Sequence, residues 1–294
     1  MPATTAPGRR RLRVGCEFLF GVAADLPTVL QVEVRRDGGF TIVEEHLEVE
    51  PATGSSTYLD LYGNRCRRLR LDGEASTVRY EAVVDTTADV DDEGTGNPDP
   101  TVAGVPDEVL HFTLPSRYCE SDLLATTAWR LFGGVDPGWP RARAVCDWVH
   151  ANIDFAPAST GPMTTASDVY LQRRGVCRDF THLGVTFLRA LNIPARYCFG
   201  YLPDIDVPAV DESMDFVAWL EAWIGGRWYT LDPRNNMRRT GRVLVGRGRD
   251  AADVSMVTSF GPLPLLGLRV VAEEAEVEPW SSAAPAILDL VGRW

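Results

Sequence analysis

The sequence predicts an α+β protein, in which an N-terminal β-sandwich precedes a core of helices packed on an antiparallel sheet. Two observations predict this class. Stretches that alternate apolar and polar residues fill the first third of the chain, and helical patterns followed by strands fill the remainder. Helices followed by a sheet is the order expected of an α+β core. At 294 residues, the chain is long enough for two domains.

The first strands recur at a spacing typical of a sandwich. We expect them at residues 11–20, 29–34, 40–49, 58–61, 67–71 and 77–84. Residues 86–104 are rich in Asp, Gly and Pro, which predicts a long loop or linker where the sandwich ends. We therefore assign residues 1–104 to the sandwich with its acidic linker, residues 105–276 to the core, and residues 277–294 to a C-terminal tail that forms a short helix or frays.

The core is expected to begin with helices and end with strands. Helices are predicted at residues 121–131, 141–152, 167–174 and 177–191, and strands at 195–201, 216–224, 228–232 and 268–272. Ser167 and Asp168 are candidate N-caps of the third helix, and Gly175 stands where that helix would end.

Cys177 is the candidate nucleophile. It lies in the segment 174–180, whose sequence is RGVCRDF, and it extends the apolar stripe of the fourth helix at its N-terminal end. Unpaired N–H groups and the positive end of the helix dipole favour a thiolate there and can bind a developing oxyanion. The alternative is a buried structural cysteine, because cysteine is among the most easily buried residue types.

Residues 215–233 read as a β-hairpin with a two-residue Gly-Gly turn. The turn fixes a register that pairs Ile224 with Arg227, Trp219 with Asp232, and Val217 with Arg234. Val217 and Asp232 then share one face as diagonal neighbours, roughly 7 Å apart at Cβ. An aspartate at that distance could orient an imidazole. A valine occupies the position instead.

Several segments resemble the bacterial transglutaminase-like family, a branch of the papain-like cysteine fold. They are residues 14–18 (VGCEF), 62–68 (YGNRCRR), 114–119 (LPSRYC), 192–197 (NIPARY), 226–232 (GRWYTLD) and 241–253 (GRVLVGRGRDAAD), in addition to the cysteine segment. The resemblance covers nearly the whole chain. It implies a Cys-His-Asp triad that attacks an amide carbonyl, forms a thioester, and passes the acyl group to water or an amine.

The resemblance also implies roles for single residues. By position, Cys177 is the nucleophile, Asp232 is the orienting acid, and Val217 stands where the family has its catalytic histidine. The wall of the site is expected to include Trp219, Arg234 and Asn235. Without an imidazole, we expect Asp232 to be held by Arg234 or by the indole N–H of Trp219, since a buried carboxylate needs partners.

None of the four histidines is an evident replacement. His182 lies five residues along the predicted helix from Cys177, about 140° around its axis, so it is expected to face elsewhere and to be structural. His150 is expected to cap a helix C-terminus.

Composition limits the partners. The net charge of -12 argues against nucleic acid and anionic membrane surfaces as partners. The six cysteines show no paired metal-ligand spacing, which predicts reduced thiols and neither zinc nor another cofactor. No run approaches the roughly 20 apolar residues of a membrane helix, and no signal peptide is convincing, so a cytoplasmic location is expected. The resemblance implies a peptide, an amide or an activated acyl small molecule as substrate.

The incomplete triad leaves three functional hypotheses. The first is a Cys177-dependent acyl-transfer or amide- or thioester-processing enzyme with an altered mechanism, which we favour from the sequence. The alternative is an inactive pseudoenzyme that binds a ligand or a protein. A conventional amidase or transglutaminase would need proton transfer from an unidentified group, since losing a general base costs roughly 10²- to 10⁴-fold in rate.

Overall fold

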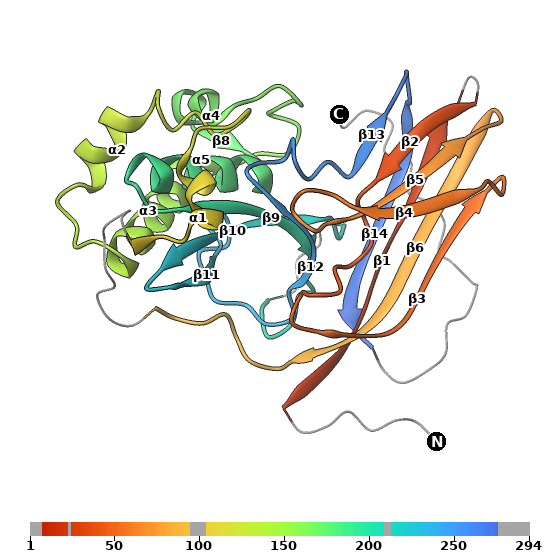
Figure 1. Cartoon of the computed structure of the whole chain (residues 1–294), viewed down its shortest axis with the longest axis horizontal. Helices are drawn as coiled ribbons and strands as arrows, with labels where there is room; N and C mark the ends of the chain where they lie inside the picture. Colours follow the sequence, from red (N-terminus) through yellow and green to blue (C-terminus); the bar gives the residue numbers. More distant parts are fainter. Residues whose placement is uncertain (1–7, 23–24, 95–103, 209–212, 276–294) are drawn as a thin grey trace.

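Two antiparallel sheets face each other in one part of the molecule, and a third sheet covered by helices forms the other part (Figure 1). The computed structural model describes residues 8–22, 25–94, 104–208 and 213–275. Helices and antiparallel sheets coexist in it, which confirms the predicted α+β class. No helix within these residues is both long and apolar enough to span a bilayer.

The N-terminal strands form the sandwich that their alternation predicts. One sheet has the order β14-β1-β6-β3 and contains β1 (Arg9–Gly21), β3 (Thr41–Glu50), β6 (Ala75–Thr87) and β14 (Leu265–Glu274). The other has the order β13-β2-β5-β4 and contains β2 (Leu26–Leu30), β4 (Ser55–Leu59), β5 (Arg65–Leu71) and β13 (Val257–Ser259). Every second residue of β1 from Leu12 to Phe20 is buried between the sheets, as period-two alternation requires.

The last strand belongs to the sandwich, and its expected place in the core is wrong. β14 pairs antiparallel with β1, with Cys16 opposite Val270, and β13 pairs with β2. The apolar residues Leu268, Val270 and Ala272 join the buried cluster of the sandwich. Alternation identifies a strand but carries no information about which distant strand it pairs with. The division at residues 104 and 276 stays a proposal, with the amendment that the chain returns to the sandwich after the core.

The core has helices on one side of the sheet β11-β10-β9-β12 and the sandwich on the other (Figure 1). Its short elements are α1 (Asp107–Leu110), the 3-10 turn η2 (His111–Thr113), β7 (Asp154–Phe155) and β8 (Arg174–Gly175). Its helices are α2 (Ala125–Phe132), α3 (Trp139–Asn152), α4 (Ala166–Gln172) and α5 (Cys177–Ala190). The sheet contains β9 (Ala195–Tyr201), β10 (Val217–Ile224), β11 (Arg227–Leu231) and β12 (Val243–Gly248). Leu183 and Phe187 of α5 pack in one apolar cluster with Leu220 of β10, which fixes the helix on the sheet.

The ends of α4 differ from the expected ones. Thr165 is the N-cap, and its side chain and that of Asp168 form a reciprocal capping box, so Ser167 caps nothing. At the other end Arg173 adopts a left-handed conformation with φ of 60°, and Gly175 lies beyond it in β8. The capping box needs a residue pair three apart, which the Thr165 and Asp168 spacing supplies.

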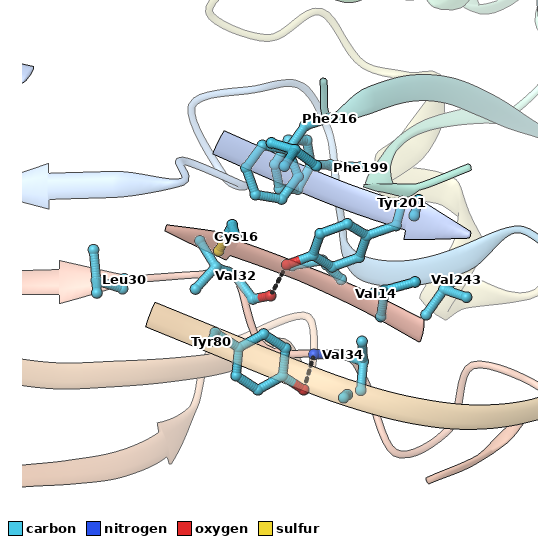
Figure 2. Close-up of a cluster of buried hydrophobic side chains, with 14 of the residues drawn as sticks. Val14, Cys16, Leu30, Val32, Val34, Tyr80, Phe199, Tyr201, Phe216 and Val243 are labelled. Carbon is cyan, nitrogen blue, oxygen red and sulfur yellow. Dashed lines mark hydrogen bonds between the residues drawn. The ribbon is translucent and has the colours of Figure 1, made fainter. Parts of the chain in front are cut away.

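A buried junction joins the sandwich to the core sheet (Figure 2). The Tyr201 hydroxyl of β9 donates to the Val32 carbonyl at 2.9 Å, and its ring lies 5.0 Å from that of Phe216. Phe216 also stacks on Phe199 at 4.9 Å. Because these side chains are buried together with β1 residues, the two parts share one apolar core.

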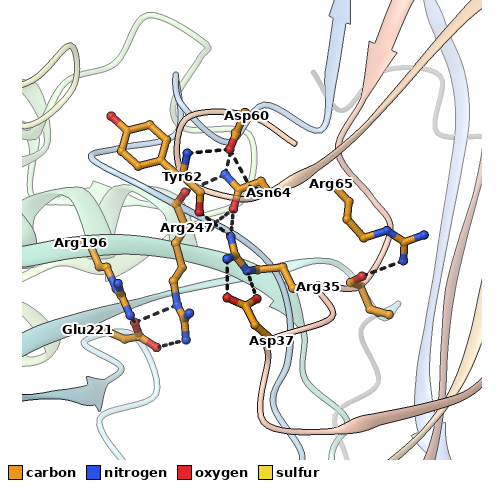
Figure 3. A network of polar contacts seen from close by, with 10 residues as sticks. Arg35, Asp37, Asp60, Tyr62, Asn64, Arg65, Arg196, Glu221 and Arg247 are labelled. Atoms are coloured by element: carbon orange, nitrogen blue, oxygen red, sulfur yellow. Dashed lines mark hydrogen bonds and ion pairs between the residues drawn. The ribbon is translucent and has the colours of Figure 1, made fainter. Parts of the chain in front are cut away.

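A largely buried network of polar contacts also links the sandwich to the core sheet (Figure 3). Asn64 of the sandwich donates to the Arg247 carbonyl and accepts from the Arg247 N–H, both at 2.8 Å. Arg247 and Arg196 both pair with Glu221. Burial opposes ionisation of Glu221, but the two arginines outweigh it and hold its pKa below the ordinary value. These bonds fix the sandwich against β9, β10 and β12.

The acidic stretch is bound to the core in its described part. Asp91 accepts from Arg242 at 2.9 Å, and Asp92 pairs with Arg227 at 2.9 Å. As expected, residues 88–94 form no helix or strand. They are bound to the core, so this part of the stretch is not a free linker. Residues 95–103 of the expected linker and the tail 277–294 lie outside the described residues.

Loss of the Tyr201 hydroxyl is expected to destabilise the whole chain. Tyr201→Phe leaves the buried Val32 carbonyl without its donor, which costs about 1–3 kcal/mol. Because the core is shared, urea unfolding followed by both tryptophan fluorescence and far-UV circular dichroism should shift as one transition. The matched control is Tyr170→Phe on α4, since the Tyr170 hydroxyl has no hydrogen bond among the described residues. Two separate transitions in the Tyr201 variant would contradict a shared core.

Candidate active site at the start of helix α5

Cys177 is the first residue of α5, at the position the sequence predicts. The helix start is held by Asp179, whose Oδ2 accepts from the Val176 N–H at 2.9 Å and from the Thr160 hydroxyl at 2.5 Å. Gly175 is required by close approach, because a Cβ there would lie 2.7 Å from the Asp179 Cβ. Two residues of the segment therefore fix the position of Cys177: Gly175, which is small enough to precede the helix, and Asp179, which binds the helix start from its first turn.

The thiol of Cys177 lies against the beginning of β10. Its Sγ is 3.8 Å from the Phe216 carbonyl, and the Ala218 N–H also faces the sulfur. Phe216 and Ala218 flank Val217, so this strand position lies next to Cys177, the candidate nucleophile. The side chain of Cys177 is half-buried.

The environment keeps this thiol protonated. Burial and, to a smaller extent, the charge of Asp215 raise the pKa of Cys177 to about 11, although the Ala218 N–H and Arg234 oppose the rise. The expectation that the helix start favours a thiolate is therefore wrong, since desolvation outweighs the helix N–H groups and dipole.

The predicted hairpin register holds only in part. Ile224 pairs with Arg227, and the ladder continues to Leu220 opposite Leu231. The expected pairs of Trp219 with Asp232 and Val217 with Arg234 do not form, because β11 ends at Leu231. Pro233 has no N–H to donate, and the Asp232 side chain bonds the next backbone N–H groups, so the chain turns away there.

Asp232 is buried and accepts four hydrogen bonds. Its Oδ1 takes the N–H groups of Arg234 at 3.1 Å and Asn235 at 3.0 Å. Its Oδ2 takes the Asn235 side-chain amide at 2.9 Å and the Arg242 guanidinium at 3.1 Å. The expected partners, the Arg234 side chain and the Trp219 indole, are wrong, since Trp219 packs against the Arg242 guanidinium, 5.1 Å from its ring. Two oxygens with four bonds leave no acceptor position for an imidazole.

All four histidines are among the described residues, and none is bonded to Cys177 or Asp232 in that part of the chain. His182 is fully buried, accepts the Ala251 N–H at 3.1 Å and stacks on Tyr118, and burial lowers its pKa to about 3. His150 lies in the last turn of α3 but bonds the Arg234 carbonyl at 2.8 Å, so its expected capping role is wrong. His46 lies in β3, and the His111 ring is tilted by 39° against that of Phe112.

The sequence interpretation missed two groups at this site. Arg242, which holds Asp232, is brought there by β12, and no local pattern predicts that approach. Asp215 influences the thiol, and alternation along the strand could have found it, since residues 215, 217 and 219 fall on one side. Cavities of about 360 Å³ near Trp223 and about 280 Å³ near Tyr58 lie elsewhere. Among the described residues, no three His, Cys, Asp or Glu side chains converge as metal ligands.

The reactivity of Cys177 is expected to rise steeply with pH. Only the thiolate is alkylated, and a raised pKa means that the thiolate is scarce at neutral pH and forms as pH rises toward about 11. Iodoacetamide labelling, followed by peptide mass spectrometry, should accelerate roughly tenfold per pH unit from about pH 7 to about pH 10. The Cys177→Ser variant provides the blank. A labelling rate that reaches half of its maximum at or below about pH 8.5, as for a free cysteine, would contradict the raised thiol pKa.

Comparisons of the sequence with known proteins identify a superfamily and several relatives. The model of the transglutaminase-like superfamily matches residues 125–233, the part that contains Cys177 and Asp232. An uncharacterized protein of Mycobacterium leprae is 30% identical over 234 residues, which are 73% of this chain and 79% of the relative. An uncharacterized protein of Mycobacterium tuberculosis is 36% identical over 121 residues, 38% of each chain.

A solved structure matches the fold over almost its full length. It is that of a candidate cysteine protease from Cytophaga hutchinsonii, which is 30% identical, covers 92% of this chain and 93% of its own, and gives a TM-score of 0.83. The agreement extends over both the sandwich and the core. On this shared fold and sequence, the chain belongs to the transglutaminase-like superfamily.

Proposed function

We propose that this protein is a transglutaminase-like binding module, which holds a peptide or acyl ligand over Cys177 without cleaving amides through a Cys-His-Asp relay. The observation that carries the proposal is the state of Asp232, whose four hydrogen bonds come from backbone groups, Asn235 and Arg242. The geometry thus favours the inactive pseudoenzyme, which is the alternative from the sequence, over the enzyme with an altered mechanism. The remaining residues still supply a half-buried thiol at a helix start.

Among the described residues, the site lacks a side chain that could transfer a proton to and from Cys177. Amide cleavage requires a base that takes the proton of Cys177 and an acid that returns it to the leaving nitrogen. Val217 can do neither, and a thiol with a pKa of about 11 is only about one part in 10⁴ ionised at neutral pH. The general base that would take this proton is missing, and losing such a base costs roughly 10²- to 10⁴-fold in rate, so we expect little ordinary amide turnover.

A second candidate function is acyl transfer from an activated ester or thioester. The partial exposure of Cys177 and the Ala218 N–H beside its sulfur favour it. In this reaction the thiol gives its proton to solvent and the thiolate attacks the carbonyl. The leaving group departs with the electron pair of the broken bond as a thiolate or alkoxide, which takes a proton from solvent. An activated leaving group needs no proton from the protein.

The cysteines and the net charge support a location and a class of partner for the protein. We propose a cytoplasmic location, since the six cysteines are all unpaired, which is typical of a reducing compartment. The acidic net charge of -12 supports a peptide or small-molecule ligand and neither a nucleic acid nor a membrane surface.

The two candidates are expected to differ in what happens to Cys177. A binding module should be protected from iodoacetamide at Cys177 by a pool of casein peptides, and p-nitrophenyl acetate or an acetyl thioester should leave no acetyl group on the protein by intact mass. An acetyl adduct that forms within minutes and is absent from Cys177→Ser would favour acyl transfer. No protection and no adduct would contradict both.

Restoring a histidine alone is expected to fail. In Val217→His the imidazole finds no acceptor on Asp232, since the Asn235 amide and Arg242 occupy Oδ2. The reactivity of Cys177 at neutral pH should stay within about twofold of the parent, whereas Val217→His combined with Asn235→Ala frees one acceptor and should raise it roughly tenfold or more. Asn235→Ala alone is the control. A full gain in the single Val217→His variant would show that Asp232 was never blocked.

A further inference from the structure

Arg234 is a cation near the thiol without a carboxylate at ion-pair distance among the described residues. Its Nη1 donates to the Asn235 side-chain oxygen at 3.3 Å. Its guanidinium carbon lies 4.0 Å from the centre of the Phe155 ring. Other arginines around the site are paired, Arg242 with Asp232 and Arg178 with Asp179.

The surrounding strands bring this cation to the start of α5. β7 pairs with β8 so that Phe155 lies opposite Gly175, two residues before Cys177. Phe155, which is 39% exposed, therefore lies in the strand beside the residues that precede α5, and the Arg234 guanidinium lies over its ring. The charge of Arg234 reaches the sulfur, since it lowers the pKa of Cys177 against the larger effect of burial.

Asp215 does not satisfy Arg234. The Asp215 Oδ1 accepts the Phe216 N–H at 2.7 Å, and no ion pair joins it to the guanidinium in the described part of the chain. Desolvation raises the pKa of Asp215, and Arg234 lowers it only in part. Positive and negative groups thus stand near the thiol, with the positive group on the Phe155 side.

We propose that Arg234 is a specificity-determining residue, which binds a carboxylate of the ligand held at Cys177. This inference rests on the proposed function, since it names the ligand class of the same site. A guanidinium already stacked on an aromatic ring is oriented before a ligand arrives, and its free N–H groups match the planar carboxylate. The ligand class is therefore a peptide or acyl compound with a carboxylate close to the carbonyl that faces the sulfur.

Two alkylating probes that differ by one charge test this directly. Iodoacetate carries a carboxylate and iodoacetamide carries the neutral amide, and both form the same C–S bond with release of iodide. A change in thiol pKa affects both rates equally, so the rate ratio of iodoacetate to iodoacetamide at Cys177 isolates carboxylate recognition. The ratio is measured on the full chain by peptide mass spectrometry and compared with that of free glutathione.

Arg234→Gln is expected to lower the ratio roughly two- to fivefold, the size expected for a partly exposed charge pair. Asp215→Asn should raise it. The matched control is Arg227→Gln, because Arg227 also stacks on a ring, that of Tyr229 at 4.2 Å, but begins β11, opposite the far end of β10. Arg227→Gln should leave the ratio unchanged.

An unchanged ratio in a folded Arg234→Gln protein would overturn the proposal, and so would a Cys177 that neither probe reaches at alkaline pH. Circular dichroism establishes folding, and Arg234→Lys, which keeps the charge, should retain part of the preference. The proposed function fails separately, since protection by casein peptides is measured with iodoacetamide alone. Protection without a carboxylate preference would keep the binding module and reject the role of Arg234.

Discussion

The buried carboxylate of Asp232 is the group on which the chemistry of this molecule depends. A carboxylate can be buried only when charged or polar donors compensate for lost water, and here Arg242 and Asn235 supply them with two backbone N–H groups. Arg242 is bound in turn by Asp91, from the stretch that follows the sandwich. Asp232 is thereby part of a structural charge network, in which its two oxygens already accept four hydrogen bonds.

The architecture fixes the position of Cys177 at the start of α5. α5 is packed on β10 through its apolar face, and the sandwich closes the junction around Tyr201 and Phe216. Val217, at the start of β10, is partly buried against the same apolar cluster that contains Tyr201 and Phe216. A superfamily fold can therefore persist with the cysteine in its site while the reaction changes or is lost.

Local patterns in the sequence predicted the elements that carry the site. Strand β9 begins and ends at the predicted residues, the Gly-Gly turn gives the pairing of Ile224 with Arg227, and α5 begins at Cys177. Each depends on near neighbours: apolar periodicity, turn chemistry or a small residue before a helix.

Features set by distant contacts could not be predicted in this way. The pairing of β14 with β1 joins residues about 250 positions apart in one sheet, and the approach of Arg242 to Asp232 depends on how β12 lies beside β9. The pKa of Cys177, which the helix start was expected to lower, is raised for the same reason. The helix start is visible in the sequence, whereas the burial that outweighs it comes from the strand packed against it.

The central claim, that the site has no working proton relay for amides, is tested most directly by amide turnover. Wild-type protein and Cys177→Ser are incubated with glutamine-containing casein peptides, and released ammonia, new peptide ends and amine incorporation are measured by mass spectrometry. The account predicts no difference between the two proteins over hours. Amide cleavage or amine incorporation by the wild type that is absent from Cys177→Ser would contradict it.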